Sequence, residues 1–504
     1  MRRCLPALLV SLALAAADSG PDLGPRRALA QARGMAWFAP LDGDLSREER
    51  EAFAWLLATA PLADLDAQAG PRLLEEARAA LAARKATPWG PTVPEDLFRT
   101  WVLPPRVQDE PMDGFRQLRQ AELLARVAGK TSEEAVQELN LWALSRANFV
   151  GTDPRTASPE GVIRHGGGRC NELAGLLVAA LRAVAIPARL AVVPVWAHQD
   201  GFHAWVEAWV DGRWRHLGAS EIEPVLDRAW FDPLTPRAPR ILSPAQGRPE
   251  PEDLTARYAP VRTLQIQVLG PNRRPAPGAR VDLRLANEAS LKVVRAGTAD
   301  GSGRIRLDAG PGDFWVWARQ GGRHGFRTAA AGSTEVTVTL TATGLPQQLD
   351  LTLAPAPARP EAPEQKPGPA LGAAIKRADE ARQQALAAFL DGPRAEALAQ
   401  ALKAPGAARA LRAARGNAPA VEAFLQQVPD RLPEATALLM TLSEKDLREV
   451  TPELLLDHLP PAGSPLDPEV LRPRVAEEPL EPSRVWLRQQ LPPEAEAPDQ
   501  AARV

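Results

Sequence analysis

Residues 166–189 read GGGRCNELAGLLVAALRAVAIPAR, and residues 203–217 read HAWVEAWVDGRWRHL. In the first segment a glycine-rich break precedes an apolar run of helical length, which predicts a helix that begins close to Cys170. In the second segment, strand-forming residues flank Asp211 and Gly212, which predicts a β-hairpin closed by a two-residue turn. Residues 189–193, between the two, are predicted to form another strand. This order of elements indicates an α+β domain.

The position of Cys170 favours chemical reactivity. Free amide groups and the dipole at the start of a helix favour the thiolate form of a cysteine. His203 begins a predicted strand 33 residues later, which is one way to bring an imidazole to the thiol. The alternative interpretation is a buried structural cysteine and a hydrogen-bonded strand histidine, since free cysteine often packs as a small apolar residue. Position alone leaves both interpretations open.

Four short motifs carry a resemblance to a known family. They are GRCNE at 168–172, IPAR at 186–189, HAWVE at 203–207 and DGRW at 211–214. Together they closely resemble the core of the transglutaminase-like superfamily, which includes transglutaminases, peptide:N-glycanases and bacterial cysteine proteases. Segments 152–156, 196–198 and 217–226 resemble a bacterial transglutaminase-domain group within it. The resemblance implies a papain-like fold with Cys170 as nucleophile and His203 as base, oriented by an aspartate.

The third residue of that arrangement is missing from its expected place. The aspartate of the superfamily falls on Gly218, which has no side chain to orient an imidazole. With a two-residue turn, the numbers of facing residues sum to 423, so Ser220 is predicted to face His203 and Gly218 to face Trp205. The candidate substitutes are Ser220 at the facing position, Glu221 and Glu223, which need a bulge or strand end to reach, and Asp200 in the preceding loop.

Two further site predictions concern Trp205 and metals. Trp205 shares a sheet face with Trp209, so it is predicted to belong mostly to the core, although it could also wall the substrate groove beside His203. His198, His203, Cys170 and Glu207 can be combined into a zinc site only on paper, because they lack closely spaced ligand pairs. We therefore predict neither a metal nor a cofactor.

The first residues have the layout of a cleavable signal peptide. Residues 1–17 contain two arginines, an apolar run and an Ala-x-Ala site that ends at Ala17. The apolar run is too short to span a bilayer, and no later segment is apolar enough to anchor the mature chain. We therefore expect export to the periplasm or the extracellular space. Removal of Cys4 leaves Cys170 as the single thiol, which cannot form an internal disulfide.

Composition bounds the remaining possibilities. The chain is 45% hydrophobic and 24% charged, which is typical of globular proteins. Its 504 residues are too many for one compact domain. A formal net charge of -2 supplies no basic field, so we predict no nucleic-acid partner. The 51 prolines indicate linkers between domains. The sequence makes no prediction of an oligomeric state.

We predict a multidomain α+β protein. Residues 261–353 show short alternating strands and turns, typical of a small β-sandwich, and the segments at 275–283, 298–307 and 312–316 resemble the carboxypeptidase regulatory-like (transthyretin-like) family. The full expected order is a signal peptide at 1–17, a helical region at 18–110, the transglutaminase-like core at 111–245, a linker at 246–260, the sandwich at 261–353, a Pro-rich linker at 354–369, a helical region at 370–460 and a flexible tail at 461–504.

The predicted reaction is acyl transfer at an amide, with Cys170 attacking the carbonyl and His203 acting as base and then as acid. Hydrolysis of a protein or peptide, including a glycopeptide or cell-wall peptide, is the preferred form, because the bacterial members of the superfamily are mostly hydrolytic. Gly218 supports a first alternative, a catalytically inactive binding or assembly module with the same fold. A second alternative is a glycan amidase that resembles peptide:N-glycanase.

Overall fold

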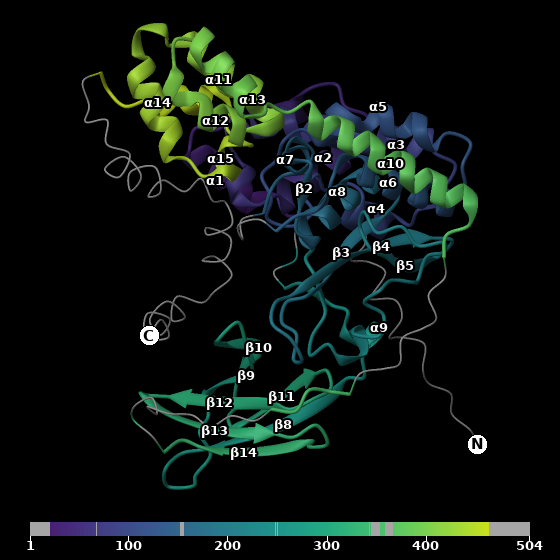
Figure 1. Ribbon diagram of the computed structural model, residues 1–504. Coiled ribbons are helices and arrows are strands. Elements are labelled where there is room, and N and C mark those ends of the chain that lie inside the picture. The colour runs from purple at the N-terminus through teal and green to yellow at the C-terminus, as the bar shows by residue number, and fades with distance from the viewer. Residues whose placement is uncertain are drawn as a thin grey trace.

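The computed structural model describes residues 21–66, 68–151, 156–246, 248, 250–341, 343, 353–357 and 366–462. The predicted signal peptide, the motif residues 152–155 and nearly all of the predicted tail lie outside these ranges. Figure 1 shows the β-sandwich as a separate unit below the core sheet, with helices from both ends of the chain above it. The structure thus has the α+β arrangement that the sequence predicts. Along the chain, one helical region precedes the transglutaminase-like core and another follows the sandwich.

The N-terminal helical region has its own apolar core. It contains α1 Gly24–Ala32, α2 Arg47–Thr59, α3 Ala69–Ala86 and α4 Glu95–Trp101. Trp37, Phe53 and Leu56 are fully buried among these helices. The side chain of Ser46 accepts the amide of Glu49, whose carboxylate accepts the amide of Ser46, so a capping box starts α2.

Helix α8 is the centre of the core. The helices of the core are α5 Phe115–Val127, α6 Ser132–Arg146, α7 Pro159–His165 and α8 Cys170–Ala183. Every residue of α8 from Asn171 to Ala183 is buried, because its sequence is apolar nearly all round and it packs against other helices on one side and the sheet on the other. The predicted start of this helix at Cys170 is confirmed.

The core sheet carries the predicted hairpin. Its strand order is β5-β4-β3-β6-β7, with β3 Ala188–Val193, β4 His203–Val210, β5 Arg213–Leu217, β6 Leu242–Ser243 and β7 Glu252–Asp253. The predicted register holds from Val210↔Arg213 to Val206↔Leu217. The strand β5 ends at Leu217, so the pairs expected beyond it do not form. A short parallel pair, β1 Asn148–Phe149 with β2 Gly167–Gly168, leads into α8.

Residues 246–260 differ from the linker that the sequence predicts. Within them, β7 pairs with β6 at the edge of the core sheet, and α9 Thr255–Tyr258 follows it. Leu254 and Thr255 are each 2% exposed. The proline and glutamate content of this segment is typical of a linker, but Leu254 and Tyr258 pack into the apolar cluster around Trp205.

Seven strands form the β-sandwich. One sheet has the order β10-β9-β12-β13 and the other the order β11-β8-β14. The apolar cluster between the sheets includes Ile266, Val281 and Val316. The strands are β8 Arg262–Leu269, β9 Arg280–Asn287, β10 Ser290–Thr298, β11 Arg304–Ala309, β12 Phe314–Gln320, β13 Arg323–Ala329 and β14 Glu335–Thr339. The assignment of this sandwich to the carboxypeptidase regulatory-like family stays a prediction.

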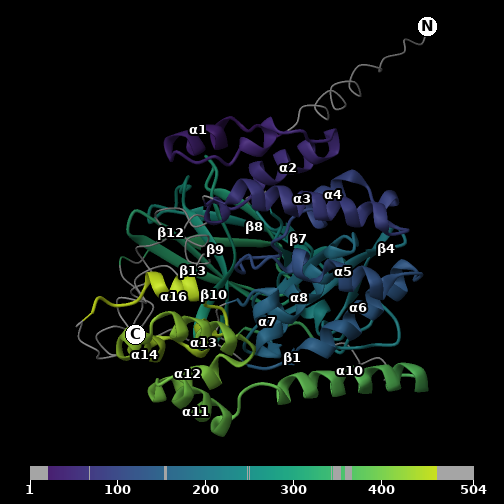
Figure 2. The same ribbon diagram turned by 90° about the horizontal axis from the view of Figure 1, so that it is seen from above.

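The C-terminal helical region divides into one long helix and a compact group. Helix α10 Pro369–Ala387 lies along α6 (Figure 2). The group consists of α11 Gly392–Ala401, α12 Ala408–Ala413, α13 Ala418–Gln427, α14 Leu432–Thr441, α15 Glu444–Leu447 and α16 Pro452–Asp457. Its core includes Leu411, Phe424 and Leu438. Among the described helices, none is both long and apolar enough to cross a membrane.

Candidate active site

Cys170 is the first residue of α8, and its sulfur lies against the start of β4. The backbone amides of Ala204 and Asn171 lie close enough to this sulfur to lower its pKa. Ala204 directly follows His203, so the fold brings the predicted nucleophile and the predicted base to the same place. The amides of Glu172 and Leu173 both donate to the carbonyl of Arg169 at 3.0 Å. The amides of Cys170 and Asn171, which precede them at the start of α8, are therefore the ones able to stabilise an oxyanion beside the thiol.

The resting thiol differs from the expected thiolate. Burial raises the pKa of Cys170, and this effect outweighs the opposing amides of Ala204 and Asn171 and the positive charge of Arg169. The carboxylate of Glu221 raises the pKa further. The helix start therefore contributes as predicted, but the depth of the site keeps the thiol protonated at neutral pH.

His203 is enclosed by aromatic rings and is 7% exposed. Its ring centroid lies 4.9 Å from those of Trp230 and Phe231, and 6.0 Å from that of Trp205, on which it is stacked. Burial among these rings lowers the pKa of His203 to about 4. The imidazole is thus neutral at pH 7 and able to accept a proton. Its Nε2 atom is buried and has no hydrogen-bond partner among the described residues.

The turn after β5 is shaped by Asn140 of α6. The Asn140 side chain donates to the carbonyls of Gly218 and Glu221, at 2.9 and 3.2 Å, and accepts the amide of Ser220 at 2.8 Å. Ser220 has a positive φ of 59°, and its hydroxyl donates to the carbonyl of Ala147 at 3.0 Å. The prediction that Ser220 faces His203 is therefore wrong, because β5 ends before this position and the chain turns toward α6 instead.

Glu221 occupies the volume beside Gly218. A Cβ atom added to Gly218 would overlap Oε2 of Glu221 and would lie 2.8 Å from its Cβ. The Glu221 carboxylate accepts the indole N–H of Trp230 at 2.9 Å, and burial raises its pKa. Because Trp230 also packs on His203, one indole ring connects Glu221 to the imidazole. Of the candidates for the third residue, Glu221 is the one that the fold brings into the site.

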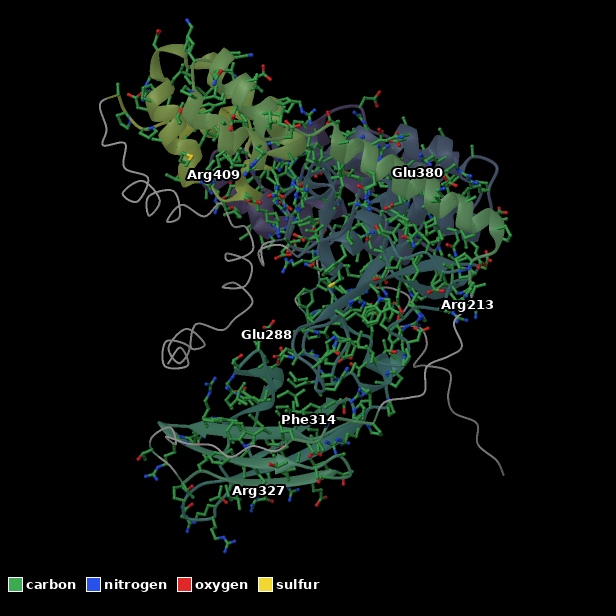
Figure 3. All side chains as sticks on the ribbon, viewed as in Figure 1. Arg213, Glu288, Phe314, Arg327, Glu380 and Arg409 are labelled. Atoms are coloured by element: carbon green, nitrogen blue, oxygen red, sulfur yellow. The ribbon has the colours of Figure 1, made fainter. Side chains whose placement is uncertain are left out.

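Asp200 points away from the site. Its carboxylate accepts the backbone amide of Glu288 at 2.7 Å. Figure 3 shows Glu288 at the end of the sandwich that faces the core. The side-chain amide of Asn287, the preceding residue, donates to the carbonyls of Trp196, Gln199 and Gly201. The loop that contains Asp200 therefore anchors the sandwich and does not orient His203.

Trp205 is fully buried and cannot wall a groove. Its indole donates to the hydroxyl of Tyr258 at 3.0 Å, so it supports His203 from within the core. Trp230, which is 54% exposed, takes the open side of the imidazole. Sequence reasoning missed both Trp230 and Asn140. The only signal for Trp230 was an aromatic pair, Trp230 and Phe231, close to the end of the motif region.

The described residues contain no group of three or more His, Cys, Asp or Glu side chains with the arrangement of a metal site. Glu207, one of the four residues considered above as zinc ligands, has other hydrogen-bond partners. Its carboxylate accepts hydrogen bonds from Arg189, Arg257 and Tyr258. This network fills the core behind β4.

One family model matches part of the chain. Residues 121–219 match the family described as the transglutaminase-like superfamily, and this range contains both Cys170 and His203. None of the curated proteins matches the chain. The matching solved structures include a "putative cysteine protease" from Cytophaga hutchinsonii, at 22% identity and a TM-score of 0.19. That match covers 22% of this chain and 41% of the other, so the chain spans less than half of that protein. Residues 121–219 therefore form a transglutaminase-like superfamily domain.

Proposed function

We propose that this protein is a cysteine hydrolase that cleaves amide bonds in peptides, with Cys170 as nucleophile and His203 as base. One observation carries the proposal. The sulfur of Cys170, at the start of α8, lies beside the backbone amide that directly follows His203, and this amide lowers the thiol pKa. A thiol, an imidazole and the start of a helix thus lie close together, which is the arrangement that acyl transfer needs.

In the first half of the reaction, the sulfur attacks the amide carbon while His203 takes the thiol proton. The carbonyl oxygen becomes an oxyanion, to which the amides of Cys170 and Asn171 at the start of α8 donate hydrogen bonds. The C–N bond then breaks, and the imidazolium of His203 gives its proton to the departing amine. An acyl group remains on Cys170 as a thioester.

In the second half, water attacks the thioester, and His203 accepts a proton from that water. The C–S bond breaks, the sulfur takes the proton back from the imidazolium, and the carboxylic acid product leaves. The pair begins and ends neutral, in agreement with the raised pKa of Cys170 and the pKa of about 4 for His203. Activity should therefore fall first as the pH drops through the raised pKa of Glu221, and again below about pH 4, where His203 is protonated and cannot act as base.

Glu221 takes the part of the missing aspartate in this proposal. Its carboxylate fills the volume beside Gly218, and it shares Trp230 with His203. A carboxylate that shares this indole ring with the imidazole would favour the imidazolium that forms during the attack. The same charge raises the pKa of Cys170, so its two effects on the site have opposite signs.

The Glu221→Gln variant separates these two effects. Hydrolysis should fall by about tenfold or more, because the imidazolium loses its counter-charge. Alkylation of Cys170 at neutral pH should become faster or stay unchanged, because the thiol pKa falls. If both rates fall together, Glu221 only supports the local fold and is not the substitute for aspartate.

The central experiment is a screen of fluorogenic peptide amides with the purified protein and three variants. Cleavage should be lost in Cys170→Ala and Cys170→Ser, and nearly lost in His203→Ala. His324→Ala is the matched control, because His324 is also buried and stacked on a tryptophan, but in the sandwich. Mass spectrometry should detect an acyl adduct on Cys170. Cleavage that survives in Cys170→Ala would refute the proposal.

The resting site also favours a second candidate, an inactive binding module. The raised pKa of Cys170 and the unpartnered Nε2 of His203 are the observations that support it. The pH dependence of alkylation decides between the two. A rate that His203→Ala lowers supports the hydrolase, whereas a rate that follows an ordinary thiol and ignores His203 supports the binding module.

We further infer that the protein acts outside the cytoplasm, on the basis of the signal-peptide layout of residues 1–17. Cleavage after Ala17 would make Asp18 the first residue of the mature chain. Intact-mass analysis of the protein isolated from its natural host tests this inference. A full-length cytoplasmic chain would contradict it.

A further inference from the structure

Exposed apolar side chains gather around the candidate site. Of the large apolar residues that are exposed among the described residues, four flank Cys170 or His203 in the fold. They are Phe149, Val150, Phe202 and Trp230. Exposed apolar side chains are common singly, but several of them beside one site mark that site as a surface that binds another molecule.

Strand β1 brings Phe149 and Val150 to the site. Phe149 is paired with Gly168, two residues before Cys170, and the amide of Val150 donates to the carbonyl of Gly168 at 3.0 Å. A Cβ atom on Gly167 would lie only 2.6 Å from Val150 Cγ2, so glycine is what allows this close packing. Phe149 is 66% exposed, although it lies directly beside the entry to the catalytic helix.

The other two side chains lie on the imidazole side. Phe202 immediately precedes His203, and its ring lies 5.9 Å from the guanidinium of Arg169, the neighbour of Cys170. Trp230 packs on His203 and is held in place by its hydrogen bond to Glu221. Apolar surface thus borders the reacting pair both from β1 and from the loops beside β4.

We propose that Phe149, Val150, Phe202 and Trp230, here called the apolar rim, bind large apolar side chains of a peptide next to the scissile amide. This inference rests on the proposed hydrolase and names its substrate class as peptide segments rich in aromatic and aliphatic residues. Exposed aromatic side chains give large contact area at little cost in conformational entropy, which suits them to this task.

Aromatic rings also stack on sugars, so a glycan is the main competing occupant. A sugar ring needs several hydrogen-bonding groups beside the aromatic face. The apolar rim includes the aliphatic Val150, and the indole N–H of Trp230 is already bonded to Glu221. These features favour an apolar side chain.

The test uses the thiol itself, so that no substrate has to be known. Second-order rates of Cys170 alkylation are measured with iodoacetamide, N-phenethyl-iodoacetamide and N-iodoacetylglucosamine, each divided by the rate with glutathione. The phenethyl reagent should be favoured over iodoacetamide by at least about tenfold. The ratio between two reagents cancels any change in the intrinsic reactivity of the thiol.

Variants then assign the preference to the apolar rim. Phe149→Ser, Phe202→Ser and Trp230→Ser should each lower the phenethyl preference by at least about threefold. Phe326→Ser is the matched control, because Phe326 has a similar exposure, 42%, on the sandwich. It should leave the preference unchanged.

The outcomes separate this inference from the function on which it rests. A thiol that reacts in a His203-dependent way but shows no phenethyl preference overturns the apolar rim and leaves the hydrolase standing. A preference that survives all three serine variants does the same. Preference for the glucosamine reagent replaces the peptide with a glycan. A thiol that reacts with none of the reagents refutes the accessible nucleophile, and the apolar rim with it.

Discussion

Helices α6 and α8 begin with related caps in very different surroundings. At α6, Thr131 and Glu134 form a capping box in which each side chain bonds the amide of the other, and both residues are exposed. At α8, Glu172 accepts the amide of Arg169 at 2.8 Å in the same way, but its side chain is fully buried. An exposed cap stabilises only the helix that it starts. A buried cap with a carboxylate also needs hydrogen-bond donors or a positive charge inside the protein to compensate the buried charge.

The structure satisfies that charge from distant parts of the chain. Oε1 of Glu172 accepts the amide of Ala157 at 2.9 Å and the ammonium of Lys445 at 2.5 Å. Lys445 belongs to α15 and lies 273 residues further along the chain. Burial raises the pKa of Glu172, but Lys445 and the two amides outweigh it and hold the pKa below its ordinary value. The start of α8 therefore depends on the C-terminal helical region.

The largest expected effect comes from Glu172→Gln. This change removes the charge of a fully buried carboxylate that accepts the ammonium of Lys445 and the amides of Ala157 and Arg169, and breaking a buried ion pair typically costs about 3–5 kcal/mol. Thermal unfolding should show a lower midpoint, and Cys170 alkylation should change because the helix start shifts. Glu134→Gln at α6 is the control and should leave alkylation unchanged. Equal effects of the two variants on alkylation would remove the distinction between the caps.

Lys445→Met should lower the free energy of unfolding by less, about 2–3 kcal/mol at neutral pH. The Glu172 carboxylate keeps its amide donors in this variant and can also take up a proton. Lys376→Met is the matched control, since that lysine is 79% exposed on α10. Urea unfolding of both variants measures the difference. A Lys445→Met protein as stable as the control would show that the buried ion pair contributes nothing.

The pH dependence of this loss has a definite sign. In the native chain the folded pKa of Glu172 is lowered, so its contribution to stability is present above the unfolded pKa of about 4.3 and is lost as the pH falls through the folded value. Without Lys445 the folded pKa rises. The stability gap between the native chain and Lys445→Met should therefore narrow as the pH falls from 7 toward 4. A gap that widens would contradict this assignment.

The smallest effect is expected for Thr131→Ala, about 1 kcal/mol, which is the usual cost of losing an N-cap side chain. The rate of Cys170 alkylation should not change, because this cap contacts neither the sheet nor the C-terminal region through its own hydrogen bonds. Circular dichroism melting together with alkylation kinetics measures both quantities. A change in alkylation would mean that α6 also controls the site.

Local features of this fold were predictable from sequence. The Asp211-Gly212 turn fixes the register of β4 and β5 as far as Leu217. The capping residues Thr131 and Ser158 mark the starts of α6 and α7. The meeting of Cys170 and His203 followed from the family resemblance. For the turn and the two caps, the deciding interactions lie within a few residues or within one short hairpin, whereas Cys170 and His203 belong to different elements, 33 residues apart.

What the sequence could not predict depends on distant partners. The turn that carries Glu221 is shaped by Asn140, 78 residues before Gly218, and the cap of α8 depends on Lys445. Alternation placed Trp205 on a sheet face but could not tell that Tyr258 and its neighbours cover that face. The segment at 246–260 has the composition of a linker, yet it completes the core sheet. In all of these, tertiary contacts outweigh the local pattern.

The packing of Glu221 against Gly218 also has an evolutionary consequence. An aspartate introduced at Gly218 alone would collide with Glu221, and a glycine at 221 alone would remove the carboxylate that shares Trp230 with His203. On our proposal, each of these two single substitutions gives a defective protein. A change from an acidic residue at 221 to one at 218 therefore requires both substitutions together. A double variant with Gly218→Asp and Glu221→Gly should therefore be more active than either single variant. Positions 218 and 221 are therefore expected to change together during evolution. A glycine at the expected aspartate position does not by itself show that the protein has lost its enzymatic activity.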